Sequence, residues 1–225
     1  MLEGLNLEAR RGRRVLFTGL AFAARPGQLV RVTGANGAGK TTLLRMIVGL
    51  GTPNAGQVHW QGRPIGAPRA AFHARLAYLG HAAALKDDLT AIENLRAMSA
   101  LGGDRCDDAQ AKAALAEAGL RGRERLPARV LSQGQRRRVA LARLVLAASR
   151  DLWVLDEPFN ALDAAATDWL AGLIRGRLLC VGSRSGLRAA ESSSRLGHGF
   201  RVESLSVSQL LIRSAVSRCV HLTVA

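Results

Sequence analysis

Residues 34–41 of the chain read GANGAGKT and fit the pattern G-x-x-x-x-G-K-[ST] in full. A strand-like segment, QLVRVT at 28–33, precedes the run, and apolar residues at helical spacing follow it at 43–48. Glycines let backbone N–H groups approach phosphate oxygens, and the helix that follows directs its positive end at them. This order of elements predicts a phosphate-binding loop between a buried strand and a helix.

The loop assigns separate tasks to its residues. Lys40 would neutralise the β- and γ-phosphates of ATP, and the Thr41 hydroxyl would bind Mg²⁺. A chance glycine loop is the alternative, but the full match between a strand and a helix argues against it. The nucleotide-binding residues that the pattern predicts are Gly34, Ala35, Asn36, Gly37, Ala38, Gly39, Lys40, Thr41 and Thr42.

A second segment, LWVLDE at 152–157, predicts a buried strand that ends in two acids. Asp156 would join Thr41 in the Mg²⁺ shell, and Glu157 would orient or deprotonate the attacking water. Two solvated acids at a strand end are the alternative, which the phosphate loop in the same chain makes a minor one. We therefore expect Glu157 and Lys40 to be catalytic.

A third segment, VLSQGQRRRVALARL at 130–144, places Ser132, Gly134 and Gln135 at the start of a helix. These residues suit a second phosphate cradle at a serine-capped helix N-terminus. Taken alone, the segment fits an ordinary capped amphipathic helix with a basic face equally well.

The three segments in this order resemble the ATP-binding cassette (ABC) ATPases, and the resemblance covers residues 1–175. It implies a homodimer that encloses two ATP molecules, in which Ser132 and Gly134 contact the nucleotide bound by a second copy. The stretch NALD at 160–163 resembles the loop that crosses the dimer seam in that family.

Three stretches resemble more narrowly the ATPase subunits of cytochrome c maturation systems: GHAAALKDDLTAIENL at 80–95, LSQGQRRRVALARL at 131–144 and LDEPFNALD at 155–163. That likeness implies a peripheral protein on the cytoplasmic face of the bacterial inner membrane. Its implied partners are integral permease subunits of the CcmB/CcmC kind, and its task is haem export or delivery. Motion would pass to the permease through residues near 81–88.

Alternating strand and helix patterns predict an α/β P-loop NTPase core with a largely parallel sheet. An antiparallel β subdomain is expected near the N-terminus from strands at 2–9 and 20–25 and a hairpin at 56–65. A helical subdomain is expected as an insertion at about 86–134, with helices at 90–101, at 107–118 and from 132. A last helix is expected at 164–174, so the ABC ATPase domain spans 1–175.

Composition constrains the partners less than the motifs do. The net charge is +15, but Lys40, Lys86 and Lys112 are the only lysines, and the arginines are scattered without aromatic residues between them. We expect no nucleic-acid partner. The alternatives are a soluble ABC regulator of ribosomes or nucleic acid, which the charge would help, and a nucleotide-binding subunit with impaired hydrolysis.

Other sequence features bear on the compartment. No run of 18 apolar residues and no basic-then-apolar leader occurs, so we expect neither a membrane span nor secretion. The three cysteines are widely spaced, which indicates reduced, incidental thiols: Cys106, Cys180 and Cys219.

The sequence departs from the family pattern at three places. RRGRR at 10–14 stands where an aromatic ring would stack on adenine, and it is either a stacking arginine or a solvated turn. His81 and Ala82 replace a glutamine, so that His81 either reports on the γ-phosphate or is a plain strand-end histidine. Gln133 replaces a glycine, from which we expect little loss.

The tail at 176–225 does not match the family. Ten serines occur in these fifty residues, against three in the first 175, and no histidine occurs between His81 and His198. The family's next strand and its γ-phosphate histidine should fall at about 180–190, within a boundary error of several residues. LLCVG at 178–182 is the one short strand pattern there. Our hypothesis is a change of reading frame near 175–179, which leaves ATP binding with hydrolysis near background.

Translating the coding DNA in the other two frames tests this hypothesis. A strand pattern followed by Thr-His in a shifted frame would support it, whereas random text in both frames would refute it. At the protein level, robust turnover that His198→Ala abolishes would show instead that a divergent tail folds back to serve the site.

Overall fold

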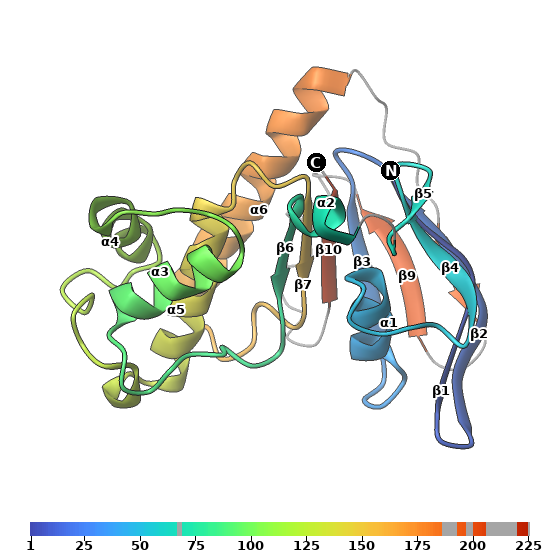
Figure 1. Ribbon diagram of the computed structural model, residues 1–225, viewed down its shortest axis with the longest axis horizontal. Helices are drawn as coiled ribbons and strands as arrows, with labels where there is room; N and C mark the ends of the chain where they lie inside the picture. The colour runs from blue at the N-terminus through green and yellow to red at the C-terminus, as the bar shows by residue number, and fades with distance from the viewer. Residues whose placement is uncertain (67–68, 186–192, 197–199, 206–219, 225) are drawn as a thin grey trace.

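The computed structural model describes residues 1–66, 69–185, 193–196, 200–205 and 220–224. Two β-sheets stand side by side, and a lobe of helices lies beyond the larger one (Figure 1). The described helices include none that is long and apolar enough to cross a membrane.

The smaller sheet confirms the antiparallel subdomain near the N-terminus. Its strands, in the order β2-β1-β4-β5, are β1 (Leu2–Arg11), β2 (Arg14–Ala24), β4 (Ala55–Trp60) and β5 (Arg63–Pro64). The expected second strand at 20–25 was too short, because pairing with β1 continues back to the Arg11–Arg14 hairpin. Leu2, Leu7 and Leu20 are fully buried beneath this sheet.

The larger sheet has six strands in the order β6-β7-β10-β3-β9-β8. They are β3 (Leu29–Gly34), β6 (Leu76–Leu79), β7 (Leu152–Leu155), β8 (Ser193–Leu196), β9 (Phe200–Leu205) and β10 (Val220–Val224). β6 pairs with β7 in parallel, and β10 is antiparallel to both β7 and β3. β3, β6 and β7 therefore run in one direction, which confirms the α/β class, while the tail strands β8, β9 and β10 make the sheet mixed rather than largely parallel.

Three helices pack on or near the sheets: α1 (Lys40–Ile47), α2 (Arg69–His73) and α6 (Ala164–Ser185). The helix expected at 164–174 is therefore longer, and LLCVG at 178–182 lies within it rather than in a strand. Leu178 is 1% exposed, and the Arg177 guanidinium lies 4.5 Å from the ring centroid of Trp153. Burial lowers the pKa of Arg177 to about 10. His198 lies outside the described residues.

The helical lobe consists of α3 (Ala91–Leu101), α4 (Asp108–Glu117), the 3₁₀ turn η1 (Ala128–Val130) and α5 (Gln133–Leu146). Its apolar centre includes Leu95 and Leu115, and α5 adds Val139. Other residues of α5, Leu141 and Leu144, pack with β6, β7 and α6. One helix thus belongs to the apolar cores of both the lobe and the large sheet.

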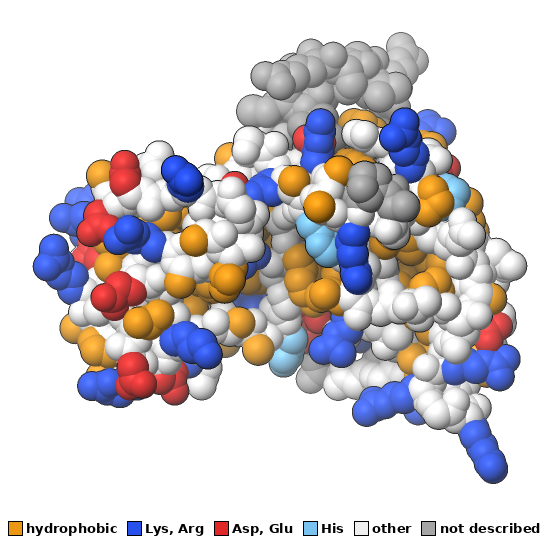
Figure 2. Space-filling view, in the orientation of Figure 1, with side chains coloured by type: hydrophobic (Ala, Val, Ile, Leu, Met, Phe, Trp, Pro, Cys, Tyr) orange, Lys and Arg blue, Asp and Glu red, His pale blue; other side chains and the backbone are white. Residues whose placement is uncertain are grey.

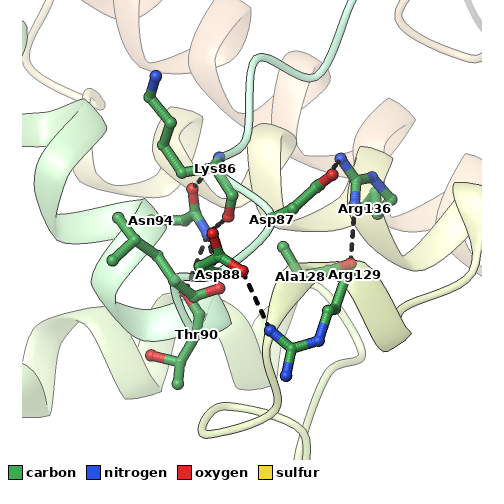
Figure 3. Close-up of polar contacts among 9 residues, drawn as sticks. Lys86, Asp87, Asp88, Thr90, Asn94, Ala128, Arg129 and Arg136 are labelled. Atoms are coloured by element: carbon green, nitrogen blue, oxygen red, sulfur yellow. Dashed lines mark hydrogen bonds and ion pairs between the residues drawn. The ribbon is translucent and has the colours of Figure 1, made fainter.

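The loop that enters the lobe is fixed by a buried asparagine (Figure 3). Asn94 is 2% exposed; its Oδ1 accepts a hydrogen bond from the Lys86 N–H at 2.8 Å. Its Nδ2 lies 2.9 to 3.1 Å from the carbonyl oxygens of Lys86, Leu89 and Thr90.

Two ion pairs fix the other side of the same loop. Asp88 pairs with Arg129 at 3.1 Å and Asp87 with Arg136 at 2.7 Å, so the loop also contacts η1 and α5 (Figure 3).

Replacing Asn94 by alanine should lower the free energy of unfolding by about 1–3 kcal/mol, because buried carbonyl and N–H groups lose their partner. Urea titration followed by circular dichroism measures this loss. As a matched control on the same helix, Arg96→Ala breaks an exposed ion pair with Asp108 and should cost under about 1 kcal/mol. Equal losses in the two variants would contradict the role given to Asn94.

Candidate nucleotide-binding site

A cavity of about 720 Å³ opens at the edge of the large sheet where β3, β6 and β7 end. Ligands of α/β proteins bind at this carboxyl edge, because the loops that follow parallel strands converge there. The residues that line it are Arg11, Leu16, Asn36, Gly37, Gly39, Lys40, Thr41, Thr42, His81, Glu157 and Asn160.

The phosphate loop takes a conformation that depends on glycine. Gly37 and Gly39 have φ angles of +75° and +106°, and a Cβ on Gly39 would lie 3.2 Å from Leu16 Cβ. No side chain caps α1, which begins at Lys40. Its first N–H groups are therefore left for an anion at the helix N-terminus.

Lys40 lies folded across this loop and is 7% exposed. Its Nζ donates hydrogen bonds to the carbonyls of Gly34 at 2.8 Å and Ala35 at 3.0 Å. Gly34 and Ala35 therefore position the lysine rather than line the cavity, and buried Ala38 closes the turn with an N–H bond to Ala35. Lys40 also lines the cavity.

Asp156 is buried directly behind the loop and is 1% exposed. Burial raises the pKa of its carboxyl, and a hydrogen bond from the Thr41 hydroxyl partly offsets this. The Oδ2 atom is buried without a hydrogen-bond partner. An unsatisfied carboxylate oxygen beside a hydroxyl is the kind of donor set that suits Mg²⁺.

Glu157 follows with a φ angle of +47°, which is uncommon for a residue with a side chain. Its Oε2 lies 3.4 Å from His81 Nδ1 and 3.4 Å from Asn160 Nδ2. The structure therefore brings the expected catalytic carboxylate to the cavity that Lys40 and Thr41 also line.

Arg137 is a residue of this site that sequence reasoning missed. It is 5% exposed, and one Nη donates to the carbonyls of Gly80 at 3.0 Å and His81 at 3.1 Å. The other Nη donates to the carbonyls of Asp156 at 2.8 Å and Glu157 at 2.9 Å. Burial lowers the pKa of Arg137. The run at 136–138 looked like a basic face, and only the fold turns its middle residue inward.

The third segment lies apart from the phosphate loop within one chain. Ser132 and Gln135 form a capping box, in which Ser132 Oγ accepts from the Gln135 N–H at 3.2 Å and Gln135 Oε1 accepts from the Ser132 N–H at 3.0 Å. A Cβ on Gly134 would lie 2.9 Å from the Ala161 carbonyl oxygen. None of these three predicted residues is among the described residues that line the 720 Å³ cavity.

The departures from the family pattern also have places in the fold. Arg11 lines the cavity beside Leu16, whereas Arg10 pairs with Glu8. Ala82 and Gln133 line a neighbouring cavity of about 650 Å³ between the lobe and the sheet. On the face in Figure 2, basic side chains are spread over the helical lobe and over the part that contains the two sheets, rather than gathered in one patch.

Replacing Lys40 by alanine should abolish ATP binding or weaken it by about 10- to 150-fold, because a hydrogen bond to a charged group contributes about 1.5–3 kcal/mol. Isothermal titration calorimetry with ATP and Mg²⁺ measures the loss. Lys112→Ala, an exposed lysine in the helical lobe, is the matched control. ATP affinity equal to that of the parent in Lys40→Ala would show that this loop is not the site.

Comparison with known proteins agrees with this geometry. Residues 17–160 match the family described as ABC transporter. The chain is 53% identical over 178 residues to the "Cytochrome c biogenesis ATP-binding export protein CcmA" of Dechloromonas aromatica, covering 79% of this chain and 87% of that protein. It is 45% identical over 200 residues to the protein of the same name from Escherichia coli K12, covering 87% and 94%.

Solved structures agree on the fold. An "ATP binding subunit of ABC transporter" superposes with a TM-score of 0.68 at 24% identity, covering 80% of this chain and 75% of that one. A dimeric ATP-binding cassette, MJ0796 in a post-hydrolysis state with ADP and Pi, gives 0.67 at 20% identity, covering 79% and 83%. This chain therefore belongs to the ABC transporter family of ATP-binding proteins and, within it, to the group of cytochrome c biogenesis ATP-binding export proteins.

Proposed function

We propose that this chain is the ATP-hydrolysing subunit of a transporter that exports or delivers haem in cytochrome c biogenesis. One observation carries the enzymatic part: Lys40, Thr41 and Glu157 line a single cavity, with Asp156 directly behind it. The role in cytochrome c biogenesis is supported by the names of relatives that match most of the chain.

Each group at the cavity has a task in hydrolysis. Lys40 and the open N–H groups of α1 hold the β- and γ-phosphates, since they supply positive charge where the phosphates lie. Thr41 and Asp156 would hold Mg²⁺, which would neutralise charge on the phosphate oxygens. Glu157 orients the attacking water and accepts its proton.

A second copy of the chain completes the site in this proposal. Ser132 and Gly134 lie outside the cavity within one chain, so in this proposal they serve the nucleotide of a second copy. The dimeric structure of the similarly folded MJ0796 with ADP and Pi supports such an arrangement. Closing and opening of the dimer would follow ATP binding and hydrolysis.

The motion would reach a permease through the helical lobe. Arg137 joins the strand ends of the site to α5, and the ion pairs of Asp87 and Asp88 join α5 and η1 to residues 86–94. Integral subunits of the CcmB/CcmC kind would receive this motion, with the chain held at the cytoplasmic face of the inner membrane.

A nucleotide-binding subunit with slow hydrolysis is the second candidate. It is favoured by the course of the chain after residue 175, where α6 continues to Ser185 although the family's next strand was expected at about 180–190. The γ-phosphate histidine expected at about 180–190 is absent from the sequence. The two candidates are separated by comparing the rate of ATP turnover of this chain with that of a relative that has the γ-phosphate histidine.

Replacing Glu157 by glutamine should leave ATP binding intact and stop water activation, so an ATP-bound dimer should accumulate. The expected result in size-exclusion chromatography with light scattering is a dimer at saturating ATP and Mg²⁺ and a monomer without nucleotide. Combining the change with Lys40→Ala is the control, which should remain monomeric. A Glu157→Gln protein that stays strictly monomeric with ATP would contradict the proposed mechanism.

The partner class is tested by membrane fractionation with and without the co-expressed permease. Recovery of the chain in the membrane pellet only with the permease is the expected result. Retention on nucleic acid at physiological salt would instead favour a soluble regulator, because binding by charge alone weakens steeply as salt rises.

A further inference from the structure

We infer that His81 is a positioning residue for hydrolysis: its imidazole holds the Glu157 carboxylate in the orientation that meets the attacking water. This inference rests on the proposed function and deepens it. The two side chains come from different strand ends, His81 after β6 and Glu157 after β7, and both line the cavity that Lys40 lines.

The strand register places the two residues opposite one another. β6 and β7 are parallel, with Leu79 paired to Leu155, and His81 and Glu157 each stand two residues beyond that pair. The Asp156 N–H continues the ladder by donating to the Leu79 carbonyl at 2.8 Å. The meeting of the imidazole and the carboxylate is thus a consequence of sheet register.

Arg137 holds the backbone at both His81 and Glu157. Its guanidinium donates to the carbonyls of both His81, at 3.1 Å, and Glu157, at 2.9 Å. This cation is buried and contacts both residues at once. It therefore fixes the spacing of the two backbone segments that carry the side chains. An exposed histidine without such an anchor would sample many positions.

The contacts leave the carboxylate suited to its task. His81 Nδ1 and Asn160 Nδ2 each lie 3.4 Å from the same oxygen, Oε2, and leave Oε1 to accept a proton from water. The Glu157 side chain is 20% exposed and that of His81 is 66% exposed, so the imidazole lies at the outer side of the pair. Orientation of a reacting group is a recognised contribution to rate.

His81 is also the one histidine among the described residues that line the cavity. The sequence holds no other histidine until His198, which lies outside the described part of the chain. Of the other histidines in the described ranges, His59 and His73 are not among the lining residues, and His221 lies in β10.

The first test observes the pair without nucleotide, by ¹⁵N NMR of the histidine imidazoles, with the His81 signals assigned through His81→Ala. Glu157→Gln should shift the His81 ring signals and leave those of His59 and His73 in place. Asp87→Asn is the matched control, since Asp87 lines the neighbouring cavity with His81 but pairs with Arg136. Unshifted His81 signals in Glu157→Gln would overturn the inference.

The second test measures turnover and affinity together. His81→Ala should lower kcat about tenfold or more while the Kd for ATP stays within twofold, because positioning acts on the reacting water and not on phosphate binding. His81→Gln keeps a side-chain donor and should recover most of the rate. A kcat equal to that of the parent in His81→Ala would overturn the inference, whereas a parent that fails to bind ATP would overturn the proposed function instead.

Discussion

The buried guanidinium of Arg137 is the interaction on which the arrangement of the site depends. Four carbonyl oxygens at the ends of β6 and β7 converge on it. Charged hydrogen bonds in a region of low dielectric are strong, and unpaired carbonyls there are costly. The register of β6 and β7 sets Asp156, Glu157 and His81 near one another, and this cation holds the strand ends that carry them.

α5 extends the effect of that cation across the molecule. Its first residues form the serine-capped segment, its inward face carries Arg137, and its apolar residues pack in both the lobe and the large sheet. A helix shared by two apolar cores cannot shift in one without straining the other, because both are close-packed. The residues of the cavity and the helical lobe are thereby connected through this one helix.

Local patterns predicted the parts of this structure that depend on local physics. The phosphate loop, the acids after a buried strand and the serine cap of α5 at Ser132 all follow from neighbours in sequence. Arg137, the His81–Glu157 contact and the placement of β10 depend on strand register and on partners more than 50 residues away. Such pairings leave no periodic signal in the sequence, so only the fold reveals them.

The central position of β10 also has a consequence for how the chain reaches this fold. The pairing of Val220 with Val32 joins residues 188 apart (220 minus 32), and until it forms, β3 and β7 each present an open edge toward the middle of the sheet. Contacts of such long range form slowly because a large loop must close first. Before β10 pairs, these exposed strand edges can pair with strands of other molecules. The strands that carry the phosphate loop and the proposed catalytic acid are thus the ones whose edges stay unpaired until β10 arrives.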